Sequence, residues 1–478
     1  MEYDVVIGLE IHCELKTKSK MFSSAPVSFG SLANSCTNIV DLAHPGYLPT
    51  VNKEAVRKAI QACTAFHLEI DPLVKFDRKN YYYPDLTKGF QVTQQFHPIG
   101  RNGYIMIPLA DGSEKKVRIN RIHMEEDTAK QFHLNDGTLI DFNRAGTPLI
   151  EIVSEPDMEN GAQAAAYVET LRETLLYLGV SDVKMEEGSL RCDVNVSLKP
   201  KGSSVYGTKN EIKNLNSISN VEKAIDYEIA RQKEILDNGG VIEQATRRYD
   251  ETSKTTVLMR KKEGAVDYKF FPEPNIFPIQ LDLNWIKEIQ ESLPELPGAK
   301  RARFVKDYGL NEYDASVLVG NIEACALFEC LVKDCKNTKM AANWMISEVL
   351  AYTNKNNVPC TTLMDKMANL ACLLNMVEGN EISNKQAKQL LEDVLNGKDP
   401  KKLVEEKGMK QQSDPTQLAA WINEVLEANP QSITDYANGK DRAVGFIVGQ
   451  VMKKSRGQAN PALTNQMVVA ELKKRIDA

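Results

Sequence analysis

The chain has 478 residues, a length that suits two or three domains and leaves ample material for a hydrophobic core. Its composition is that of an ordinary globular protein, because 42% of the residues are hydrophobic and 26% are charged. The formal net charge of −6 excludes a globally basic nucleic-acid binder, so any contact with nucleic acid needs a local basic patch. No apolar run approaches the roughly 20 residues that a membrane-spanning helix needs, so we expect no membrane association.

The nine cysteines follow no spacing typical of a disulfide framework. Four of them have apolar neighbours and are most simply small buried residues: Cys13, Cys63, Cys192 and Cys372. The sequence also opens without a basic leader or an Arg-rich transit segment. We therefore expect a reducing compartment, the cytoplasm.

The first predicted strand covers residues 5–15 and has one polar face. Apolar side chains alternate there with Glu10, His12 and Glu14, which is the period of a half-buried strand. Such a face is usually only solvated, and it gains meaning if other ligands meet it. Residues 16–50 are expected to be irregular, and residues 53–66 show the apolar spacing of a helix.

A cluster of aromatic and basic residues follows at 76–89. Three successive tyrosines, beginning with Tyr81, come directly after Arg78, Lys79 and Asn80. Two interpretations stay open. The rings could pack in a sheet while the basic side chains extend to solvent. Alternatively, the rings could stack on a nucleotide or on the acceptor end of a nucleic acid while the basic side chains bind its phosphates.

A second polar strand face lies between residues 121 and 156. Arg121, His123 and Glu125 alternate with apolar residues, and Glu151 lies inside an apolar run that indicates a buried strand. A carboxylate buried there must be paired, protonated or bound to a cation, because burial of a bare charge is too costly. Two alternatives follow: a structural ion pair, with Arg144 as the candidate partner, or a divalent-metal site.

The remaining pattern over about the first 290 residues completes an α+β domain. The expected elements are a helix over 161–178 that ends at Gly179, strands over 188–198 and 209–213, and a helix whose capping box is Ser219 with Glu222.

From residue 299 onward the spacing is almost entirely helical. We expect helices at 299–307, 312–334, 339–353, 360–376, 384–396, 415–428 and 440–453, with a break at 397–400. Basic runs at 453–457 and 473–475 are usually solvated faces, and they also suit an RNA-contacting module on an acidic chain.

Several common chemistries are excluded. The sequence contains no Gly-x4-Gly-Lys-Ser/Thr phosphate loop, no Gly-x-Gly-x-x-Gly fingerprint and no Gly-x-Ser-x-Gly or Gly-x-Cys-x-Gly nucleophile elbow. What remains is a set of strands with carboxylates on one face, which cannot all ionise together without cations. Oxygen ligands with a single imidazole suit Mg²⁺ or Mn²⁺ better than zinc. Together with nearby bases, they favour metal-assisted phosphoryl transfer from ATP.

Longer motifs carry a resemblance that covers essentially the whole chain. They are VIGLEIH at 6–12, FDRKNYYYPD at 76–85, DFNRAGTPLIEIVSEP at 141–156, MEEGSLRCD at 185–193, EIKNLNS at 211–217, GQVM at 449–452 and RGQANP at 456–461. The sequence resembles the B-subunit family of tRNA-dependent amidotransferases, which make Gln-tRNA(Gln) or Asn-tRNA(Asn) from mischarged Glu- or Asp-tRNA. It lacks the large inserted domain of the archaeal relative, which favours the bacterial three-subunit type.

The resemblance implies an architecture and a reaction. It implies an α+β cradle domain over 1–292 with a mainly antiparallel, glutamine synthetase-like core, an all-helical domain over 293–400 and a small helical tRNA-binding tail over 401–478. In the cradle, ATP would phosphorylate the side-chain carboxylate of the misacylated tRNA, and ammonia would displace the phosphate. The ammonia would come from an amidase A subunit, and a small C subunit would clasp the two larger chains in a heterotrimer.

The resemblance also implies the metal ligands of the site and Glu126 beside them, and the charged residues of the predicted strands and loops supply the other expected site residues. The expected Mg²⁺ ligands are Glu10, His12, Glu125 and Glu151. The expected catalytic residues are Glu125, Glu126, Arg144 and Arg191, with Arg144 facing phosphate or the substrate carboxylate. The expected ATP contacts are Lys79, Asn80, Tyr81, Asp193, Glu211 and Lys213.

One departure from the family concerns zinc. The family often has a zinc knuckle after the first strand, made of a Cys-x-Cys pair and a later Cys-x-x-Cys pair. Only Cys36 remains in this sequence, and one thiolate cannot make a structural zinc site. We therefore predict that the protein holds no zinc.

Two other functions compete with the amidotransferase hypothesis. One is a self-contained ATP-dependent carboxylate–amine ligase for a free small molecule, and the other is a non-catalytic tRNA-binding scaffold. The long helical part with its basic end disfavours the ligase, and the carboxylate-rich strands disfavour the scaffold.

Overall fold

The computed structural model describes residues 2–261, 267–410, 414–455 and 457–477. Its contacts divide the chain into two compact units, Met1–Leu296 and Pro297–Ala478, called here the sheet unit and the helical unit. The three narrower domain ranges expected from the sequence, 1–292, 293–400 and 401–478, stay predictions. Arg456, which belongs to a basic run and to the last family motif, lies outside the described residues.

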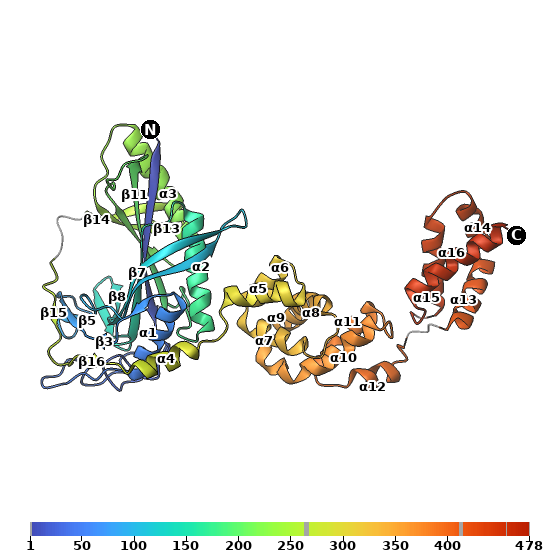
Figure 1. Ribbon diagram of the computed structural model, residues 1–478, viewed down its shortest axis with the longest axis horizontal. Helices are drawn as coiled ribbons and strands as arrows, with labels where there is room; N and C mark the ends of the chain where they lie inside the picture. Colours follow the sequence, from blue (N-terminus) through green and yellow to red (C-terminus); the bar gives the residue numbers. More distant parts are fainter. Residues whose placement is uncertain (1, 262–266, 411–413, 456, 478) are drawn as a thin grey trace. The chain divides into compact units, whose positions relative to one another are not determined.

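The sheet unit is organised around β1 (Tyr3–Glu14), which lies in the interior of a nine-stranded sheet. The other strands of this sheet are β2 (Glu69–Ile70), β6 (Gly100–Pro108), β7 (Glu114–Glu126), β10 (Pro148–Ser154), β11 (Leu190–Pro200), β12 (Asn210–Leu215), β13 (Ala245–Asp250) and β14 (Thr255–Lys261). Their order is β14-β13-β12-β11-β1-β10-β7-β6-β2, and Figure 1 shows the long central strands side by side. Neighbours are antiparallel except β12 and β13, which run parallel.

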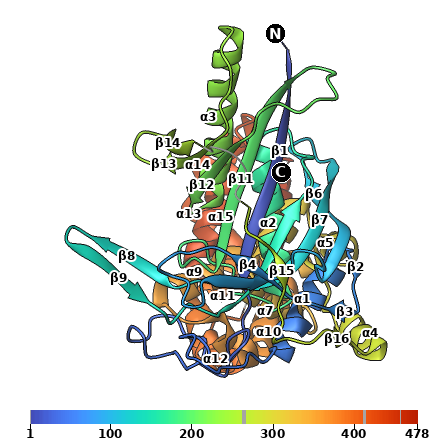
Figure 2. The same cartoon turned by 90° about the vertical axis from the view of Figure 1, so that its left-hand side faces the viewer.

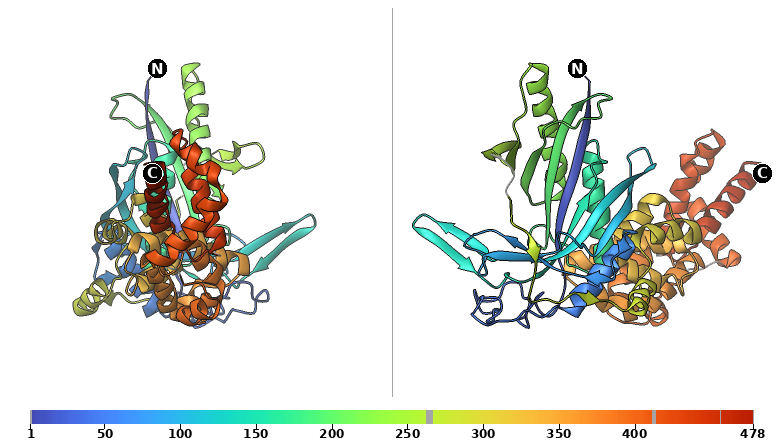
Figure 3. Two further views of the ribbon diagram at one scale, coloured as in Figure 1. Left: turned by 90° about the vertical axis from the view of Figure 1, so that its right-hand side faces the viewer. Right: turned by 60° about the vertical axis from the view of Figure 1, so that its left-hand side comes forward.

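Three smaller sheets surround the main one. Strand β4 (Asp77–Asn80) lies between β5 (Phe90–Thr93) and β15 (Phe271–Pro272), and β3 (Leu73–Val74) pairs with β16 (Ile279–Gln280). Strands β8 (Lys130–Leu134) and β9 (Gly137–Asp141) form a hairpin that extends away from the main sheet, as Figures 2 and 3 show. The turn after this hairpin leads back into β10, which carries part of the site.

Helices cover the apolar face of the main sheet. They are α1 (Lys53–Ala65), α2 (Gly161–Tyr177) and α3 (Ile218–Asp237), while α4 (Leu283–Glu291) packs beside α1. The alternation of β1 places Ile7, Leu9 and Ile11 in the core beneath these helices, with at most 1% of each side chain exposed. The opposite face of β1 is therefore left for polar residues.

Most expectations for the sheet unit are confirmed. The helix expected at 161–178 begins after Asn160, whose side chain accepts a hydrogen bond from the Gln163 amide, and Gly179 follows its C-cap with φ of +62°. The capping box of Ser219 with Glu222 is wrong. The helix begins two residues earlier, at Ile218, because the Ser217 hydroxyl accepts from the Asn220 amide and serves as the N-cap.

The helical unit confirms the expected all-helical character after residue 299. Its elements are α5 (Pro297–Tyr308), α6 (Glu312–Gly320), α7 (Ile322–Leu331), α8 (Thr338–Trp344), the π-helical η1 (Met345–Val349), α9 (Leu350–Asn356), the 3₁₀-helical η2 (Cys360–Lys366), α10 (Met367–Glu378), α11 (Asn384–Leu395), α12 (Pro400–Glu406), α13 (Pro415–Ala428), α14 (Pro430–Ala437), α15 (Arg442–Lys454) and α16 (Pro461–Asp477). The expected α+β class, with a mainly antiparallel sheet followed by helices, is thus confirmed.

Some helix boundaries differ from the expected ones. The single helix expected at 312–334 is two helices, because Asn321 adopts an extended conformation and its side chain caps α7 through the Glu323 and Ala324 amides. The sequence analysis also missed α12, α14 and α16 as separate helices. The break at 397–400 is confirmed, since Asp399 caps α12 there.

All nine cysteines are free. Cys13, Cys63 and Cys192 are buried as expected, whereas Cys372 is only half-buried, so its expected burial was wrong. Across the described residues, the structure contains no helix that combines the length and apolar character needed to cross a bilayer.

Candidate active site

Strand register places the polar faces of three adjacent strands side by side. His12 of β1 lies opposite Glu151 of β10, and Glu151 in turn lies opposite His123 of β7. Glu125 follows two residues after His123, so its side chain is on the same face. The two separate polar faces expected from the sequence therefore form one group of ionisable residues.

The side chains of this group are in close contact. His12 Nε2 lies 3.4 Å from Glu151 Oε2 and 3.7 Å from Glu125 Oε1. His123 Nε2 lies 3.3 Å from Glu151 Oε2 and 3.5 Å from Glu125 Oε2. The hydroxyl of Thr93 donates to Glu125 Oε2 at 3.3 Å and so fixes that carboxylate from β5.

His12, Glu125 and Glu151 could hold a divalent cation. Each offers one ligand atom, and these atoms all lie within 4.8 Å of one another. Two carboxylates with one imidazole are a donor set that suits Mg²⁺ or Mn²⁺. Glu10, the fourth expected ligand, lies on the same face of β1 but outside this group, and its role as a ligand stays a prediction.

The electrostatics of the group show strong mutual stabilisation. Although burial alone would lower the pKa of His123, the charge of Glu151 and hydrogen bonds to both carboxylates raise it to about 9. Burial opposes protonation of His12 as well, yet its contact with Glu151 raises the pKa above the ordinary value. Burial would raise the pKa of Glu151, but the two imidazoles hold it well below its usual range. The carboxylates of Glu125 and Glu151 therefore lie beside the two imidazoles, which supply positive charge when they are protonated.

A second group of charges begins at Glu126, the residue after Glu125. Its carboxylate pairs with Lys88 and accepts a hydrogen bond from the Val92 amide at 3.0 Å. Glu126 is only 6% exposed. Glu126 is therefore a buried carboxylate with Lys88 as its ion-pair partner.

Asp127 connects the two expected catalytic arginines. Arg191 donates to Asp127 Oδ2 at 2.6 Å, and Arg144 Nε lies 3.7 Å from the same oxygen. Although burial alone would raise the pKa of Asp127, Arg191 and Arg144 hold it below its ordinary value. Burial and the neighbouring Asp127 carboxylate raise the pKa of Glu14 to about 8. Two arginines and two carboxylates therefore form a compact group at one end of β1.

The ion pair between Arg144 and Glu151 that the sequence left open is not formed. Besides its contact with Asp127, Arg144 donates to the main-chain oxygens of Thr128 at 2.9 Å and Ala129 at 3.1 Å. Glu151 has the two histidines as partners instead. The ion-pair alternative is therefore met by the two histidines in place of Arg144, and the divalent-metal alternative stays a prediction.

Farther along the sheet, Glu10 borders a hollow. Its carboxylate accepts a hydrogen bond from Asn195 at 3.1 Å, and burial together with the charges of Glu151, Asp193 and Glu211 raises its pKa. The hollow has a volume of about 280 Å³ and is lined by Val6, Gly8, Leu9, Glu10, Val153, Ser154, Pro156, Asn195, Ser197, Tyr206, Gly207 and Lys209. Lys213 pairs with Asp193 and lies 3.1 Å from Glu211, one strand farther out.

The expected ATP contacts on β4 and the following loop lie beside another set of aromatic rings. Lys79 Nζ lies 5.0 Å from the centre of the Tyr268 ring and 5.7 Å from that of Tyr81. Asn80 donates to the main-chain oxygen of Lys269 at 2.7 Å. The structure thus brings Glu10, His12, Glu125 and Glu151 to one face, and it shows Lys79, Asn80 and Tyr81 packed against the segment that leads into β15.

Comparison with known proteins decides the family. Residues 5–287 match the family model described as the GatB/GatE catalytic domain, and residues 326–472 match the one described as the GatB domain. This chain belongs to the GatB/GatE family. Three relatives, each named as the B subunit of an aspartyl/glutamyl-tRNA(Asn/Gln) amidotransferase, are similar over their full length. Those of Geobacillus thermodenitrificans and Geobacillus kaustophilus are each 50% identical over 477 residues, and that of Bacillus mycoides is 49% identical over 476; each alignment covers 99% of this chain and 100% of the relative.

The structure adds residues to the site that the sequence analysis of this GatB/GatE chain missed. His123 contacts both carboxylates of the candidate metal group, and Asp127 joins Arg144 to Arg191. His123 was detectable, because it alternates with Glu125 on the same strand face. Asp127 gave no such signal, since it follows the end of β7 and its contacts come from segments distant in the sequence.

Proposed function

We propose that this chain is the amide-forming B subunit of a tRNA-dependent amidotransferase. In this proposal ATP phosphorylates the side-chain carboxylate of Glu-tRNA(Gln), Asp-tRNA(Asn) or both. Ammonia then attacks the acyl phosphate, so that a C–N bond forms, the C–O bond to phosphate breaks and inorganic phosphate leaves. The observation that carries the proposal is the group of His12, Glu125 and Glu151 with Arg191 opposite His12 on the next strand. The names of the Geobacillus and Bacillus relatives describe the same class of reaction.

The metal-binding residues are assigned from their donor atoms. We assign His12, Glu125 and Glu151 to a Mg²⁺ ion, with Glu10 as a further ligand from the same face. When bound there, Mg²⁺ would neutralise phosphate oxygens of ATP and so favour transfer of the terminal phosphoryl group. Thr93 supports this assignment, because its hydroxyl orients Glu125 without adding charge.

The arginines are assigned to the charges of the reaction. Arg191 and Arg144 share Asp127, which fixes their guanidinium groups, and Arg144 also donates to the main-chain oxygens of Thr128 and Ala129. A guanidinium group has five N–H donors, so each arginine has further donors for an oxyanion. We propose that both arginines bind the side-chain carboxylate of the substrate and the phosphoryl group that is transferred to it. Glu126, next to Glu125 and paired with Lys88, is assigned as the carboxylate that takes the proton lost by ammonia.

ATP is assigned to the face that runs from Glu10 toward β12 and to the loop after β4. Asp193 and Glu211 supply acceptors that suit the ribose hydroxyls, and Lys213 lies between them. Lys79, Asn80 and Tyr81 are assigned to the nucleotide from the other side, where Lys79 adds positive charge beside the rings.

The proposal requires partners. The sequence contains no Gly-x-Ser-x-Gly or Gly-x-Cys-x-Gly elbow, which fits a division of labour with a separate ammonia-producing polypeptide. We propose an amidase A subunit as the ammonia source and a small C subunit that clasps both chains, together with misacylated tRNA as substrate. The cytoplasm, where tRNA is charged in bacteria, is the proposed location.

One experiment separates this proposal from its competitors. The chain, with and without a co-expressed amidase partner, is incubated with Mg²⁺-ATP, ammonium and either Glu-tRNA(Gln) or free glutamate. Amide formation on the aminoacyl-tRNA alone supports the proposal. ATP turnover on free glutamate would instead identify a small-molecule ligase. Binding of the tRNA without turnover under either condition would identify a scaffold.

A further inference from the structure

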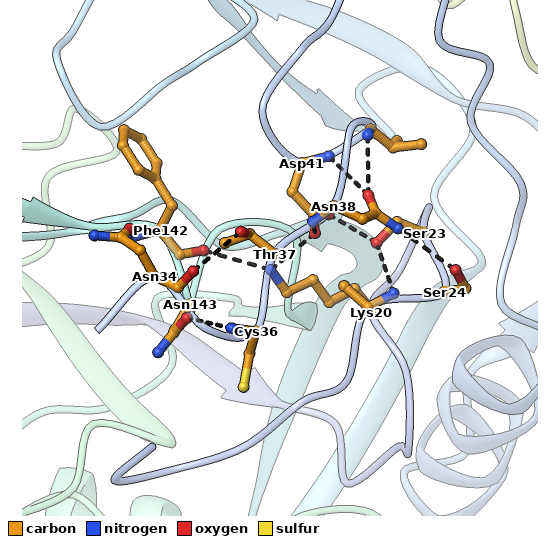
Figure 4. Close-up of polar contacts among 12 residues, drawn as sticks. Lys20, Ser23, Ser24, Asn34, Cys36, Thr37, Asn38, Asp41, Phe142 and Asn143 are labelled. Carbon is orange, nitrogen blue, oxygen red and sulfur yellow. Dashed lines mark hydrogen bonds and ion pairs between the residues drawn. The ribbon is translucent and has the colours of Figure 1, made fainter. Parts of the chain in front are cut away.

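A lysine is fully buried in the irregular segment that follows β1. Lys20 has an exposed fraction of 0%, and its ammonium group lies 3.1 Å from Asp41 Oδ2, whose side chain is only 3% exposed. The other Asp41 oxygen accepts a hydrogen bond from Ser23 at 2.7 Å, and Asp41 Oδ2 also accepts from the Asn38 amide at 3.0 Å. Figure 4 shows these contacts, in which both oxygens of the Asp41 carboxylate accept hydrogen bonds.

Stability alone is a weak reason for such a pair. A buried ion pair loses its hydration on both sides, and apolar residues of similar volume often stabilise a fold as well or better. Within the described residues, segment 16–50 has only one isolated bridge, between Ser19 and Pro26, and no helix or strand. The pair therefore occurs in a segment whose backbone is held by turns and side-chain contacts rather than by a helix or a sheet.

The first connection of the pair leads to the turn that carries Arg144. The Lys20 ammonium group donates to the main-chain oxygen of Phe142 at 3.4 Å, and the Met21 amide donates to that of Gly146 at 2.8 Å. Gly146 has φ of +83°, and a Cβ there would lie 3.1 Å from Asp41 Oδ1 and 3.3 Å from Lys20 Cδ. The turn at 142–146 is thus packed directly on the buried pair.

The turn at 142–146 also contacts the candidate site. The Gly146 amide donates to the main-chain oxygen of Asp127 at 2.9 Å, and Asp127 is the residue that Arg144 and Arg191 share. The turn at 142–146 therefore contacts both the Lys20–Asp41 pair and Asp127 of the site.

The second connection leads to the loop that carries Lys88. The Thr87 hydroxyl donates to the main-chain oxygen of Asp41 at 2.7 Å. Lys88, the next residue, pairs with Glu126. The buried ion pair thus contacts two segments that carry basic side chains, the turn with Arg144 and the loop with Lys88.

We propose that Lys20 and Asp41 are positioning residues that set the places of Arg144 and Lys88 in the site. Neither residue touches the reacting atoms. Lys20 donates to the Phe142 carbonyl, and the Asp41 main-chain oxygen accepts from the Thr87 hydroxyl, so the pair fixes the backbone beside Arg144 and beside Lys88. The role in catalysis rests on the proposed function, whereas the effect on Arg144 itself does not.

The test uses the full chain and measures Arg144 directly. The variants are Lys20→Met, which removes the ammonium group, and Asp41→Asn, which removes the charge and keeps only one of the two oxygen acceptors that Ser23, Asn38 and Lys20 use. Phenylglyoxal modifies arginines, and peptide mapping gives the rate at Arg144 relative to Arg118, which lies apart from this pair and bonds to Asp157. We expect the relative rate at Arg144 to rise about fivefold or more, because local opening exposes a side chain that is held in the native turn.

A matched control uses a buried ion pair elsewhere. Arg231 and Glu228 on α3 lie 2.6 Å apart, and the Glu228 side chain is 0% exposed. Arg231→Met should lower the melting temperature while leaving the Arg144 rate and the amide-forming kcat unchanged. Lys20→Met and Asp41→Asn should lower kcat about 10-fold or more, with KM for aminoacyl-tRNA within about twofold.

The outcomes separate the two levels of the inference. An unchanged Arg144 rate in a folded Lys20→Met or Asp41→Asn protein would overturn the proposal. An equal rise in the Arg231→Met control would also overturn it, since general destabilisation would then be sufficient. A raised Arg144 rate in a chain whose wild type makes no amide would support the positioning role and contradict the proposed reaction.

Discussion

Glu151 and His12 lie directly opposite each other on neighbouring antiparallel strands, with 3.4 Å between Glu151 Oε2 and His12 Nε2. The next strand adds His123 at 3.3 Å from the same oxygen. One carboxylate oxygen therefore meets two imidazoles from opposite sides. This contact explains how a carboxylate is tolerated inside the apolar strand β10.

Glu151→Gln should weaken divalent-metal binding. The variant keeps the shape of the side chain but removes one negative charge from the ligand group. We expect the Mn²⁺ affinity to fall at least about 10-fold, which is the lower end of the loss seen when even a residue that only hydrogen-bonds to a metal ligand is replaced. Mn²⁺ titration followed by electron paramagnetic resonance measures it. Glu169→Gln on α2 is the control, because Glu169 pairs only with Arg172 at the surface and should leave the affinity unchanged. Equal affinities for all three proteins would remove the metal assignment.

Glu125→Gln should abolish amide formation and preserve tRNA binding. Glutamine can still accept the Thr93 hydrogen bond, so the fold is retained, but the ligand charge is lost. We expect kcat to fall at least about 100-fold, the size found when one electrostatic contact to a transition state is removed. Quench-flow assays give kcat and filter binding gives the tRNA affinity. A variant that binds tRNA poorly would point to a structural role for Glu125 instead.

Arg191→Lys should impair the reaction more than the retained charge suggests. Arginine donates to Asp127 at 2.6 Å and still presents other donors, whereas a single ammonium group cannot do both. We expect kcat/KM to fall about 10-fold or more, which corresponds to roughly 1.4 kcal/mol of transition-state stabilisation. The matched variant is Arg118→Lys, whose partner Asp157 lies outside the site. If both lysine variants have the same kinetics, Arg191 does not bind the reacting groups.

The protein should contain no structural zinc. Protein purified without chelators should carry well under about 0.1 zinc per chain, because a structural site needs four ligands and only Cys36 remains of the thiolates that the family often has. Mass spectrometry of the metals measures this directly. Cys36→Ser provides the control and should have the same zinc content and melting temperature. Stoichiometric zinc that disappears in the variant would contradict the prediction.

Gly161→Ala should destabilise the sheet unit. A Cβ at Gly161 would lie 2.5 Å from the Glu222 main-chain oxygen and 2.6 Å from Asp226 Oδ1, so α2 and α3 must separate. We expect a loss of about 1–3 kcal/mol in the free energy of unfolding, typical of overpacking. Gly445→Ala in α15 meets no atom within 4 Å and should instead stabilise its helix by about 0.5–1 kcal/mol. Urea unfolding followed by circular dichroism distinguishes the two signs.

The sequence predicted the elements of the site better than their assembly. Alternation in β1 and β7 revealed the polar faces, because side-chain direction along a strand depends only on the period of two. The apolar run around Glu151 likewise revealed a carboxylate within a mostly buried strand, although Glu151 itself is only half-buried. Which strand lies beside which depends on contacts distant in the sequence, so the opposition of His12, Glu151 and His123 could not be read from periodicity.

The helical part shows a different limit. The continuous apolar spacing at 312–334 predicts one helix, and a single asparagine divides it by capping the second one. Asn321 adopts this conformation because its side chain competes for backbone amides, a local choice that spacing does not record. At the site, Asp127 was missed for the related reason that its partners come from β11 and from the turn at 142–146.

The central place of β1 has a consequence for synthesis. β1 is the first strand to leave the ribosome, yet its neighbours β10 and β11 come from residues 148–154 and 190–200. At about 5–20 residues per second, roughly 10 to 40 seconds pass before β11 is made. During that time β1 has two unpaired edges and an apolar face, the features that invite aggregation. The candidate site is therefore completed only when most of the sheet unit has been translated, because its residues come from β1, β7, β10 and β11.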